Sequence, residues 1–276
     1  MKILVTGASS GIGLDAARAL AQKGYEVYGA ARRVERMEPL KDFGVTPIAL
    51  DVTSEESIDA CLAATGPLDV LVNCAGYGSF GAIENVTLEE GRRQMEVNLF
   101  GLAALCKKVV PYMRERGSGR IVNISSVAGR ACLYFGGWYH VSKYAVEAFS
   151  DALRIELKPF GVDVVLIEPG ATNTSWGTIA ADHLEESSVG TPYEQPALAE
   201  AAMMRKVFSR RLFSEPAVVT RAICRAVRAR RPRARYIIAA GSSTMVFWHA
   251  LLPTRWWDAI VRLTGSPRLA RWVERL

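Results

Sequence analysis

The residues best suited to chemistry in this chain are Tyr139 and Lys143, a phenol and an amine four positions apart. That spacing places both side chains on one face of a helix, one turn from each other. A free phenol has a pKa near ~10, and a nearby ammonium group lowers that pKa toward the range where acid–base catalysis is efficient. Ser126 precedes the tyrosine by 13 positions, at the end of an apolar run typical of a strand, and its hydroxyl can hold a substrate oxygen beside the phenol.

The N-terminal segment supplies a second pattern, which matters because a tyrosine–lysine spacing also occurs by chance on solvated helices. An apolar run at 2–6 is followed by Gly7-Ala-Ser-Ser-Gly11-Ile-Gly13 and then by an amphipathic stretch at 14–23. A dinucleotide site needs a strand, a glycine-rich turn and a helix in this order. Glycine lets the backbone turn tightly and approach a pyrophosphate, which then lies at the positive N-terminus of the helix.

Strands and helices alternate along most of the chain. The expected strands cover 2–6, 25–31, 46–51, 68–73, 120–125, 162–168 and 235–240, and the expected helices lie near 11–23, 54–65, 87–116, 138–158 and 215–230. The strands are apolar, as expected when helices cover both faces of a sheet. The alternation predicts an α/β fold with a doubly wound parallel sheet of Rossmann type. Ligands bind at the carboxyl ends of such strands, where Gly7, Asn73, Ser126 and Pro169 fall.

In sequence order these motifs resemble the short-chain dehydrogenase/reductase family in its single-domain form, and within it the 17β-hydroxysteroid and retinol dehydrogenase-like branch. The matching segments are Thr6-Gly-Ala-Ser-Ser-Gly-Ile-Gly13, Asp51-Val52, Asn73-Cys-Ala-Gly76, Asn98, Ser126, Tyr139 with Lys143, and Pro169-Gly170. The resemblance implies hydride transfer between a nicotinamide and a carbinol or carbonyl carbon. In that mechanism Tyr139 exchanges the proton of the oxygen, Lys143 lowers the pKa of Tyr139 and binds the ribose, Ser126 orients the oxygen, and Asn98 organises a water leading to the lysine.

The resemblance also implies a set of cofactor-binding positions. They are Gly7, Ser9, Ser10, Gly11, Ile12 and Gly13 in the turn, Asp51 and Val52 at the adenine, Asn73, Ala75 and Gly76 on the adenosine side, Tyr139 and Lys143 at the ribose, and Pro169, Gly170, Thr172 and Thr174 at the nicotinamide. Thr174 is the candidate ligand of the carboxamide.

The choice of cofactor is argued from the end of the second strand. A carboxylate there would bind the 2′-hydroxyl of NAD and repel a 2′-phosphate. Here the strand ends in Arg32 and Arg33, whose guanidinium groups suit a phosphate. We therefore expect NADP(H) to be favoured over NAD(H). The alternative is that both arginines only begin a solvated helix.

The expected substrate cleft is apolar and aromatic. Beside Ser126 and Tyr139 its candidate residues are Tyr77, Phe80, Leu133, Tyr134, Phe135, Trp138 and Trp176. Such a lining suits a bulky hydrophobic alcohol, ketone or aldehyde, such as a steroid, a retinoid or another lipid. The alternative is that several of these aromatic residues are core or oligomer contacts. A non-catalytic NADP(H)-sensing protein on the same fold is the other function considered, and the complete Ser126, Tyr139, Lys143 and Asn98 set favours the enzyme.

The chain length of 276 residues is enough for one sizeable core. We assign 1–240 to the NAD(P)-binding oxidoreductase domain, and 241–276 to an amphipathic C-terminal extension packed on it. Within the domain, 171–214 is a long connection with no clear period, typical of a substrate lid. The five cysteines are scattered and form no Cys-x-x-Cys pair, so we expect a reduced, cytoplasmic setting and no metal site. Met1 stands directly before a core strand, which leaves no expected signal peptide.

Charge is distributed unevenly. From Arg205 onward there are 16 basic and 3 acidic residues, a net +13, and the first 204 residues carry 18 and 25, a net −7, which together give +6. The uncharged run 236–253 is short for a membrane span. The basic amphipathic end suits a helix packed over the cleft, which we favour, or a peripheral membrane contact, or an interface of a homodimer or homotetramer. Nucleic-acid binding is not expected, because none of its motifs appears.

Overall fold

The computed structural model describes residues 1–209, 215–238, 241–264 and 266. Its sheet consists of β1 (Lys2–Thr6), β2 (Glu26–Ala31), β3 (Val45–Ala49), β4 (Val70–Asn73), β5 (Gly119–Ile124), β6 (Val162–Pro169) and β7 (Arg235–Ile238). All neighbouring strands are parallel, in the order β3-β2-β1-β4-β5-β6-β7. The strand order reverses at β1: β2 and β3 follow on one side of it, and β4 to β7 follow on the other. In such folds ligands bind at the carboxyl ends of the strands at this switch point. The predicted doubly wound Rossmann-type sheet is confirmed.

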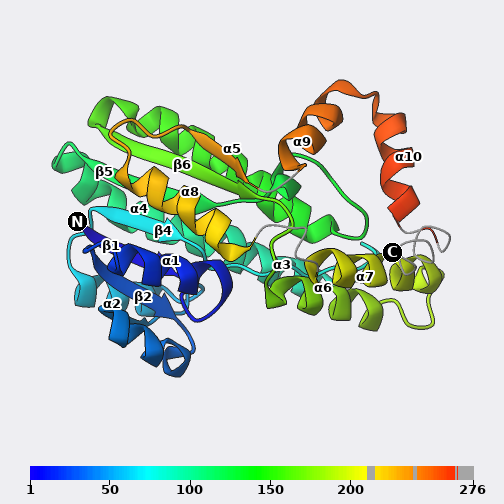
Figure 1. Cartoon of the computed structure of the whole chain (residues 1–276), viewed down its shortest axis with the longest axis horizontal. Helices are drawn as coiled ribbons and strands as arrows, with labels where there is room; N and C mark the ends of the chain where they lie inside the picture. Colours follow the sequence, from blue (N-terminus) through cyan, green and yellow to red (C-terminus); the bar gives the residue numbers. More distant parts are fainter. Residues whose placement is uncertain (210–214, 239–240, 265, 267–276) are drawn as a thin grey trace.

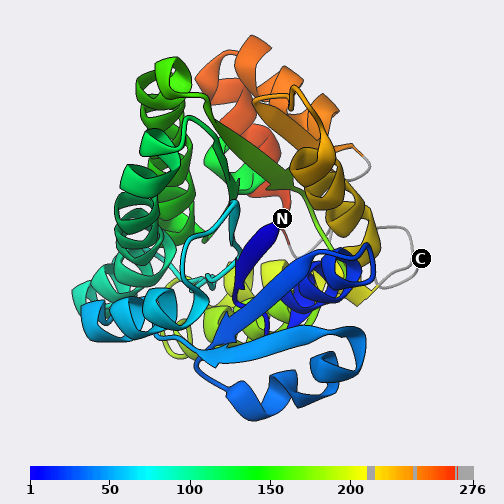
Figure 2. The ribbon, with the colours of Figure 1, turned by 90° about the vertical axis from the view of Figure 1, so that its left-hand side faces the viewer.

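Helices cover both faces of the sheet, so that three layers are visible in Figure 2. One face carries α1 (Gly11–Ala21) and α8 (Pro216–Arg228), and the other carries α2 (Glu55–Thr65), α4 (Gly101–Glu115) and α5 (Gly137–Leu157). A 3₁₀ segment, Val34–Phe43, follows β2 on the α1 side.

The core lies in two layers because alternate residues of each strand point to opposite faces. In β1, Ile3 and Val5 contact the α1 and α8 layer, whereas Leu4 contacts the α2, α4 and α5 layer. All three are completely buried. Burying such a side chain contributes about 1.5–3 kcal/mol relative to exposure, which explains why every central strand is an almost continuous apolar run.

The single long helix expected at 87–116 is interrupted. The structure has α3 (Leu88–Met95), a π-helical segment (Glu96–Phe100) and then α4. Such π-helical insertions occur often at functional sites, because the extra residue changes the direction of a side chain. Here the insertion contains the buried Asn98. The helical periodicity of the sequence continues through the insertion, so that the pattern alone predicts one helix.

The long connection expected at 171–214 contains two helices. These are α6 (Ser175–Glu186) and α7 (Glu194–Ser209), which pack against each other, and residues 210–214 lie outside the described part. Their completely buried residues are mostly small: Ala180, Ala181, Leu184, Ala197 and Ala201. Alanine differs little in hydrophobicity from its polar neighbours, so the sequence of this segment shows no clear helical period.

The C-terminal segment folds into α9 (Ser242–Leu251) and α10 (Thr254–Thr264). Figure 1 shows both at the same end of the sheet as α6 and α7, far from the N-terminus. Contacts join α10 to α7, and the indole Nε1 of Trp257 donates a hydrogen bond to the carbonyl oxygen of Cys132 at 3.0 Å. Residues 239–240, 265 and 267–276 of the predicted strand and extension lie outside the described part. Among the described helices, none combines the length and apolar character that crossing a bilayer requires.

Candidate active site

The glycine-rich turn leads from β1 into α1 as expected. Gly7 and Gly11 have φ of +67° and +54°, a left-handed region that side chains rarely adopt. A Cβ on Gly13 would lie 2.4 Å from the carbonyl oxygen of Gly7, so the helix can begin only on a glycine at this position. Ser10 caps α1 without a side-chain hydrogen bond, and the first turn contains no acid. The N-terminus of α1 therefore fits an anionic group such as a pyrophosphate.

The ends of β1 and β4 are tied together beside this turn. The Thr6 hydroxyl accepts hydrogen bonds from the backbone N–H groups of Cys74 and Ala75, at 3.1 and 3.0 Å. Asn73 is buried and donates from Nδ2 to Asn123 Oδ1 at 2.9 Å. These bonds fix the segment that the sequence predicts on the adenosine side of a dinucleotide, and Asn73 contributes to that fixation from the core.

Tyr139 and Ser126 meet at the carboxyl ends of the strands. Ser126 follows β5, and its hydroxyl donates to the carbonyl oxygen of Pro169 at 3.2 Å. Tyr139 lies in the first turn of α5 and is 8 % exposed, and its hydroxyl is near that of Ser126. Burial raises the pKa of Tyr139 to about 12, and the nearby Ser126 hydroxyl acts in the opposite direction.

Lys143 is one turn further along α5. Its Nζ lies 5.9 Å from the centre of the Tyr139 ring and donates to the carbonyl oxygen of Ile124 at 2.9 Å. Burial lowers the pKa of the amine to about 8. The sequence-based expectation that the ammonium lowers the pKa of Tyr139 does not describe this state of the protein. Burial dominates at the phenol, because apolar rings surround it and the amine faces a backbone carbonyl.

Asn98 is held by hydrogen bonds to α5 and to the segment that follows β4. Its Oδ1 accepts from the Tyr77 N–H at 3.0 Å, and its Nδ2 donates to the Tyr77 carbonyl and to Ser142 Oγ, both at 2.9 Å. A Cβ on Gly76 would lie 3.1 Å from Asn98 Oδ1 and 3.8 Å from Lys143 Nζ. The structure therefore brings the side chains of Asn98 and Lys143 to the same place beside Gly76.

An apolar cluster covers Tyr139. Trp176 of α6 lies 5.0 Å and Phe80 lies 5.7 Å from the Tyr139 ring, centre to centre. Phe135 belongs to the same cluster, together with the buried alanines of α6 and α7. The packing of Trp176 is close, since a Cβ on Gly78 would lie 2.3 Å from its ring. Two of the predicted substrate residues, Phe80 and Trp176, thus lie against the Tyr139 ring, and Phe135 belongs to the same cluster.

Other predicted cleft residues lie elsewhere. Trp138 packs on Gly91 of α3, where a Cβ would lie 2.6 Å from the indole. The Tyr77 hydroxyl donates to Glu90 Oε1 at 2.9 Å, below the guanidinium of Arg93. Leu133 is 39 % exposed and outside the cluster. Trp138 thus makes a helix–helix contact, and Tyr77 joins the segment after β4 to α3, which is the structural alternative stated for several of these aromatic residues.

The two arginines after β2 differ in setting. Arg32 and Arg33 are both exposed, and Arg33 precedes the 3₁₀ segment as its N-terminal cap. Arg32 is close enough to Asp51 to help hold the pKa of that carboxyl below its usual range, where hydrogen bonds from Thr53 act more strongly. Val52 is buried next to Asp51, and its carbonyl lies against Gly101. A cation and the predicted adenine positions therefore share one rim of the site.

The segment after β6 closes the other side of the site. The Thr172 hydroxyl donates to the Gly170 carbonyl at 3.1 Å, and Thr174 caps α6 by accepting from the Trp176 N–H at 3.4 Å. The methyl group of Thr174 faces Gly11, where a Cβ would lie 3.8 Å away. Residues after β6 and residues of the glycine-rich turn thus lie side by side, although they are far apart in the sequence.

His140 is a site residue that the sequence reading missed. It is buried, accepts from the Leu133 N–H at Nε2 (3.0 Å) and therefore carries its proton on Nδ1, 2.8 Å from the Ala128 carbonyl. Burial lowers the pKa of the imidazole. His140 thus fixes the loop that joins Ser126 to Tyr139. Its only sequence signal was its place beside the tyrosine.

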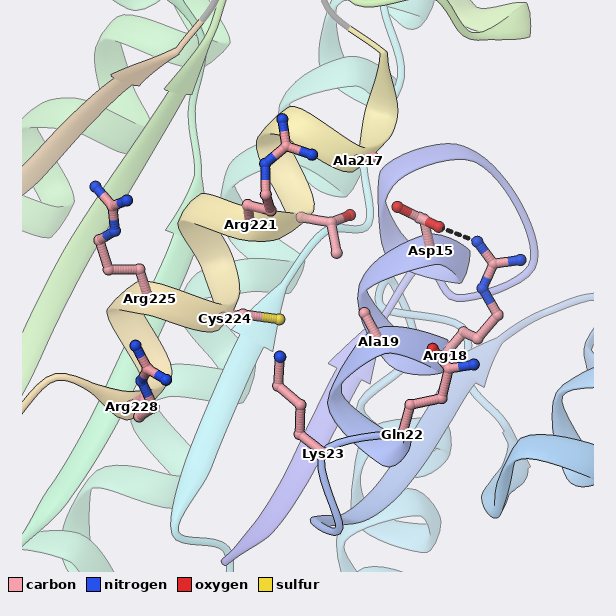
Figure 3. A pocket seen from close by; sticks show the side chains of 11 residues that line it. Asp15, Arg18, Ala19, Gln22, Lys23, Ala217, Arg221, Cys224, Arg225 and Arg228 are labelled. Carbon is pink, nitrogen blue, oxygen red and sulfur yellow. Dashed lines mark hydrogen bonds and ion pairs between the residues drawn. The ribbon is translucent and has the colours of Figure 1, made fainter.

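A hollow of about 390 Å³ lies away from this site, between α1 and α8. Its cations are Arg18, Lys23, Arg221, Arg225 and Arg228, as Figure 3 shows. In that view Arg225 extends away from α1, while the Lys23 amine reaches toward Cys224. None of the predicted catalytic residues lines this hollow.

Comparison with known proteins gives a consistent result. The family model described as short chain dehydrogenase matches residues 1–183. The probable short-chain type dehydrogenase/reductase VdlC of Helicobacter pylori is 34% identical over 264 residues, covering 94% of this chain and 96% of that protein. The 3-ketodihydrosphingosine reductase of Bacteroides thetaiotaomicron is 41% identical over 179 residues, 63% of this chain and 65% of that protein. Human retinol dehydrogenase 8 is 38% identical over 185 residues, 63% of this chain and 60% of that protein.

Solved structures extend the similarity to the whole fold. A short-chain dehydrogenase from Streptomyces avermitilis superposes with a TM-score of 0.78 at 34% identity, over 98% of this chain and 97% of that one. The closed form of serine dehydrogenase, complexed with NADP⁺, gives a TM-score of 0.75 at 27% identity, over 87% of this chain and 95% of the other.

Proposed function

Because this chain belongs to the short-chain dehydrogenase/reductase family and is an oxidoreductase of CH–OH groups, we propose that it interconverts a hydrophobic alcohol and its ketone or aldehyde with NADP(H), using Tyr139 as the acid and base. The observation that carries the proposal is the meeting of Ser126 and Tyr139 at the carboxyl ends of the strands, with Lys143 one turn away and an apolar cluster above.

The residues of the chain account for the proton side of this reaction. Ser126 holds the substrate oxygen next to the phenol, and Tyr139 gives it a proton in reduction or takes it in oxidation. Lys143 supplies a positive charge near the phenol, and Asn98 fixes the backbone beside the amine. A bound nicotinamide supplies or accepts the hydride, which is chemistry that no side chain can perform. The glycine-rich turn, with its uncapped helix N-terminus, is the part of the chain that would hold the pyrophosphate.

A preference for NADP(H) is supported by Arg32 and Arg33. Both are exposed, Arg32 lies near Asp51 at the rim of the site, and β2 ends without an acid. A guanidinium group binds a phosphate through charge-assisted hydrogen bonds. The NADP⁺ complex of the structural neighbour agrees with this preference.

A lipid-like substrate is supported by the cluster around Tyr139. Phe80, Phe135 and Trp176 offer aromatic surface, whereas a sugar-like substrate would need several polar side chains directed at it. The relatives named for ketodihydrosphingosine and for retinol fit a long apolar substrate. We further propose that α6 and α7 form the lid, within the domain assigned to 1–240, and that α9 and α10 of the extension 241–276 cover it.

A screen of NADPH oxidation tests the proposal. Steroid, retinoid, long-chain lipid and small aliphatic ketones are compared by loss of NADPH absorbance, with Tyr139→Phe as the matched control. Turnover of apolar ketones that the control lacks is expected. NADPH binding measured by fluorescence, with no turnover of any carbonyl or alcohol, would instead favour the cofactor-sensing protein.

A further inference from the structure

Two buried acids lie next to Lys143 in a place that the proposed reaction does not use. Glu147 follows Lys143 by one turn of α5, and Glu168 lies near the end of β6. Glu147 is 6 % exposed and Glu168 is 0 % exposed. Buried carboxylates are costly unless they are paired, so their partners show what keeps them there.

Two arginines from other elements pair with these acids. Arg235 of β7 lies 3.2 Å from Glu147 Oε2 and 3.1 Å from Glu168 Oε1 through its Nε, and it also contacts Asp151 Oδ2 at 2.5 Å. Arg130, in the loop before α5, lies 3.5 Å from Glu168. Arg154, also on α5, pairs with Asp151 at 2.9 Å. The pairs join the catalytic helix to the two last strands of the sheet.

The loop after Ser126 passes very close to this network. A Cβ on Gly129 would lie 2.8 Å from the Lys143 carbonyl, 2.9 Å from Ser125 Oγ and 3.0 Å from Glu147 Cγ. Glu147 Oε1 and Ser125 Oγ are both buried without a well-formed hydrogen bond. Burial raises the pKa of the Glu147 carboxyl, and the nearby Ser125 and Arg235 act in the opposite direction. Glu147 is thus held by Arg235 on one oxygen only.

Glu147 is one of the groups that affect the charge of Lys143. Burial works against the ammonium form of Lys143, and Glu147 and Cys74 are the groups whose negative charge would favour it. Burial raises the pKa of the Cys74 thiol to about 12, so that group is neutral at physiological pH. Burial and repulsion from Glu147 raise the pKa of Glu168 to about 7. The ion pair with Arg235 at 3.2 Å favours the carboxylate form of Glu147, which makes Glu147 the anion available to the amine.

We propose that Glu147 is a positioning residue for Lys143, which keeps the amine in its charged form, and that Glu168, Arg235 and Arg130 hold Glu147 in place for this role. The proposal rests on Lys143 being the active-site cation of the proposed function. Glu147 and the charged residues that hold it would then determine the pH range over which Lys143 is charged and the enzyme is active. The geometry supports this because one continuous set of contacts leads from the half-buried Arg130 to the turn of α5 that follows Lys143.

Nuclear magnetic resonance of the cofactor-free protein tests the proposal without any turnover. The protein is labelled with ¹³C at lysine Cε, the Lys143 signal is assigned with Lys143→Arg, and its shift is followed against pH. Glu147→Gln removes an anion that favours the ammonium, so the amine must lose its proton at lower pH. We expect the Lys143 midpoint to fall by about one pH unit. The variant should fold, because Arg235 keeps Glu168 and Asp151.

Matched variants complete the test. Glu156→Gln removes the same charge from an exposed position of α5 and should leave the midpoint unchanged, and Glu147→Asp should restore most of it. In the wild type, protonation of Glu168 should add a second inflection to the Lys143 titration near pH 7. Glu168→Gln, which keeps Glu147, should remove that inflection. A folded Glu147→Gln with the wild-type midpoint, or an equal shift in Glu156→Gln, would overturn the proposal. Since these titrations need no substrate, they stand even if the proposed reaction fails.

Discussion

The two ends of the Tyr139 site are built by different means. On the nucleotide side, β1, the glycine-rich turn and α1 are held by backbone geometry, since Gly7, Gly11 and Gly13 permit conformations or approaches that a Cβ would prevent. On the substrate side, α6, α7, α9 and α10 are held by side-chain packing on small residues and by single anchors such as Trp257. Backbone requirements restrict a sequence to glycine, whereas packing tolerates many apolar combinations. The nucleotide side can therefore be predicted from motifs, whereas the packing of α6, α7, α9 and α10 cannot.

The largest effect is expected where the two sides meet. Tyr139→Phe removes the proton donor and keeps the ring that packs on Trp176 and Phe80. We expect kcat to fall by about 10²–10⁴-fold, because a positioned general acid contributes that much. NADPH affinity, measured by fluorescence titration, should stay close to wild type. An active Tyr139→Phe protein would contradict the assignment of the tyrosine.

The nucleotide side alone should respond to Arg32→Ala combined with Arg33→Ala. The loss of two guanidinium groups should weaken NADPH binding about tenfold to a hundredfold and NADH binding far less. Titration of both cofactors on the same protein measures the ratio. Arg36→Ala, at an exposed position of the same 3₁₀ segment, serves as the control. An equal loss for both cofactors would mean that the arginines only begin a solvated helix.

The lid side alone should respond to Trp176→Ala. The indole occupies the space above Tyr139, so its removal should favour bulky apolar substrates over small ketones in kcat/KM by about tenfold. The KM for NADPH should not change. Trp138→Ala offers a contrast, because that indole packs between α5 and α3 and its loss should lower stability, measured by thermal unfolding, without a change of substrate preference. An unchanged preference in Trp176→Ala would remove Trp176 from the substrate cleft.

The smallest effect is expected at the outer cover. Trp257→Phe removes the hydrogen bond to the Cys132 carbonyl and keeps an aromatic ring. A severalfold rise of KM for bulky substrates, with no change for small ones, is expected if α10 covers the lid.

A separate measurement tests whether the outer face of α9 and α10 contacts membranes. Trp256 and Leu251 are 66 % and 62 % exposed. If this face contacts membranes, the full chain should sediment with anionic liposomes and be released by salt, because basic residues would meet a charged surface within a Debye length of ~8–10 Å. No sedimentation together with an unchanged KM in Trp257→Phe would leave an oligomer contact as the role of these helices.

The sequence by itself determined the parallel sheet, the glycine-rich turn and the residues that meet at Ser126 and Tyr139. These follow from local requirements: apolar runs buried on both faces, glycine where a Cβ cannot fit, and a helical spacing between a phenol and an amine. The tertiary structure alone decided features that depend on the partner of a side chain. One example is the π-helical segment that contains Asn98, whose carboxamide bonds the backbone of Tyr77. Another is the pair of helices α6 and α7, whose alanines are recognisable as core residues only when the two helices face each other. The same reason separates Trp176, above the phenol, from Trp138, in a helix contact: periodicity identifies a buried face but not what lies against it.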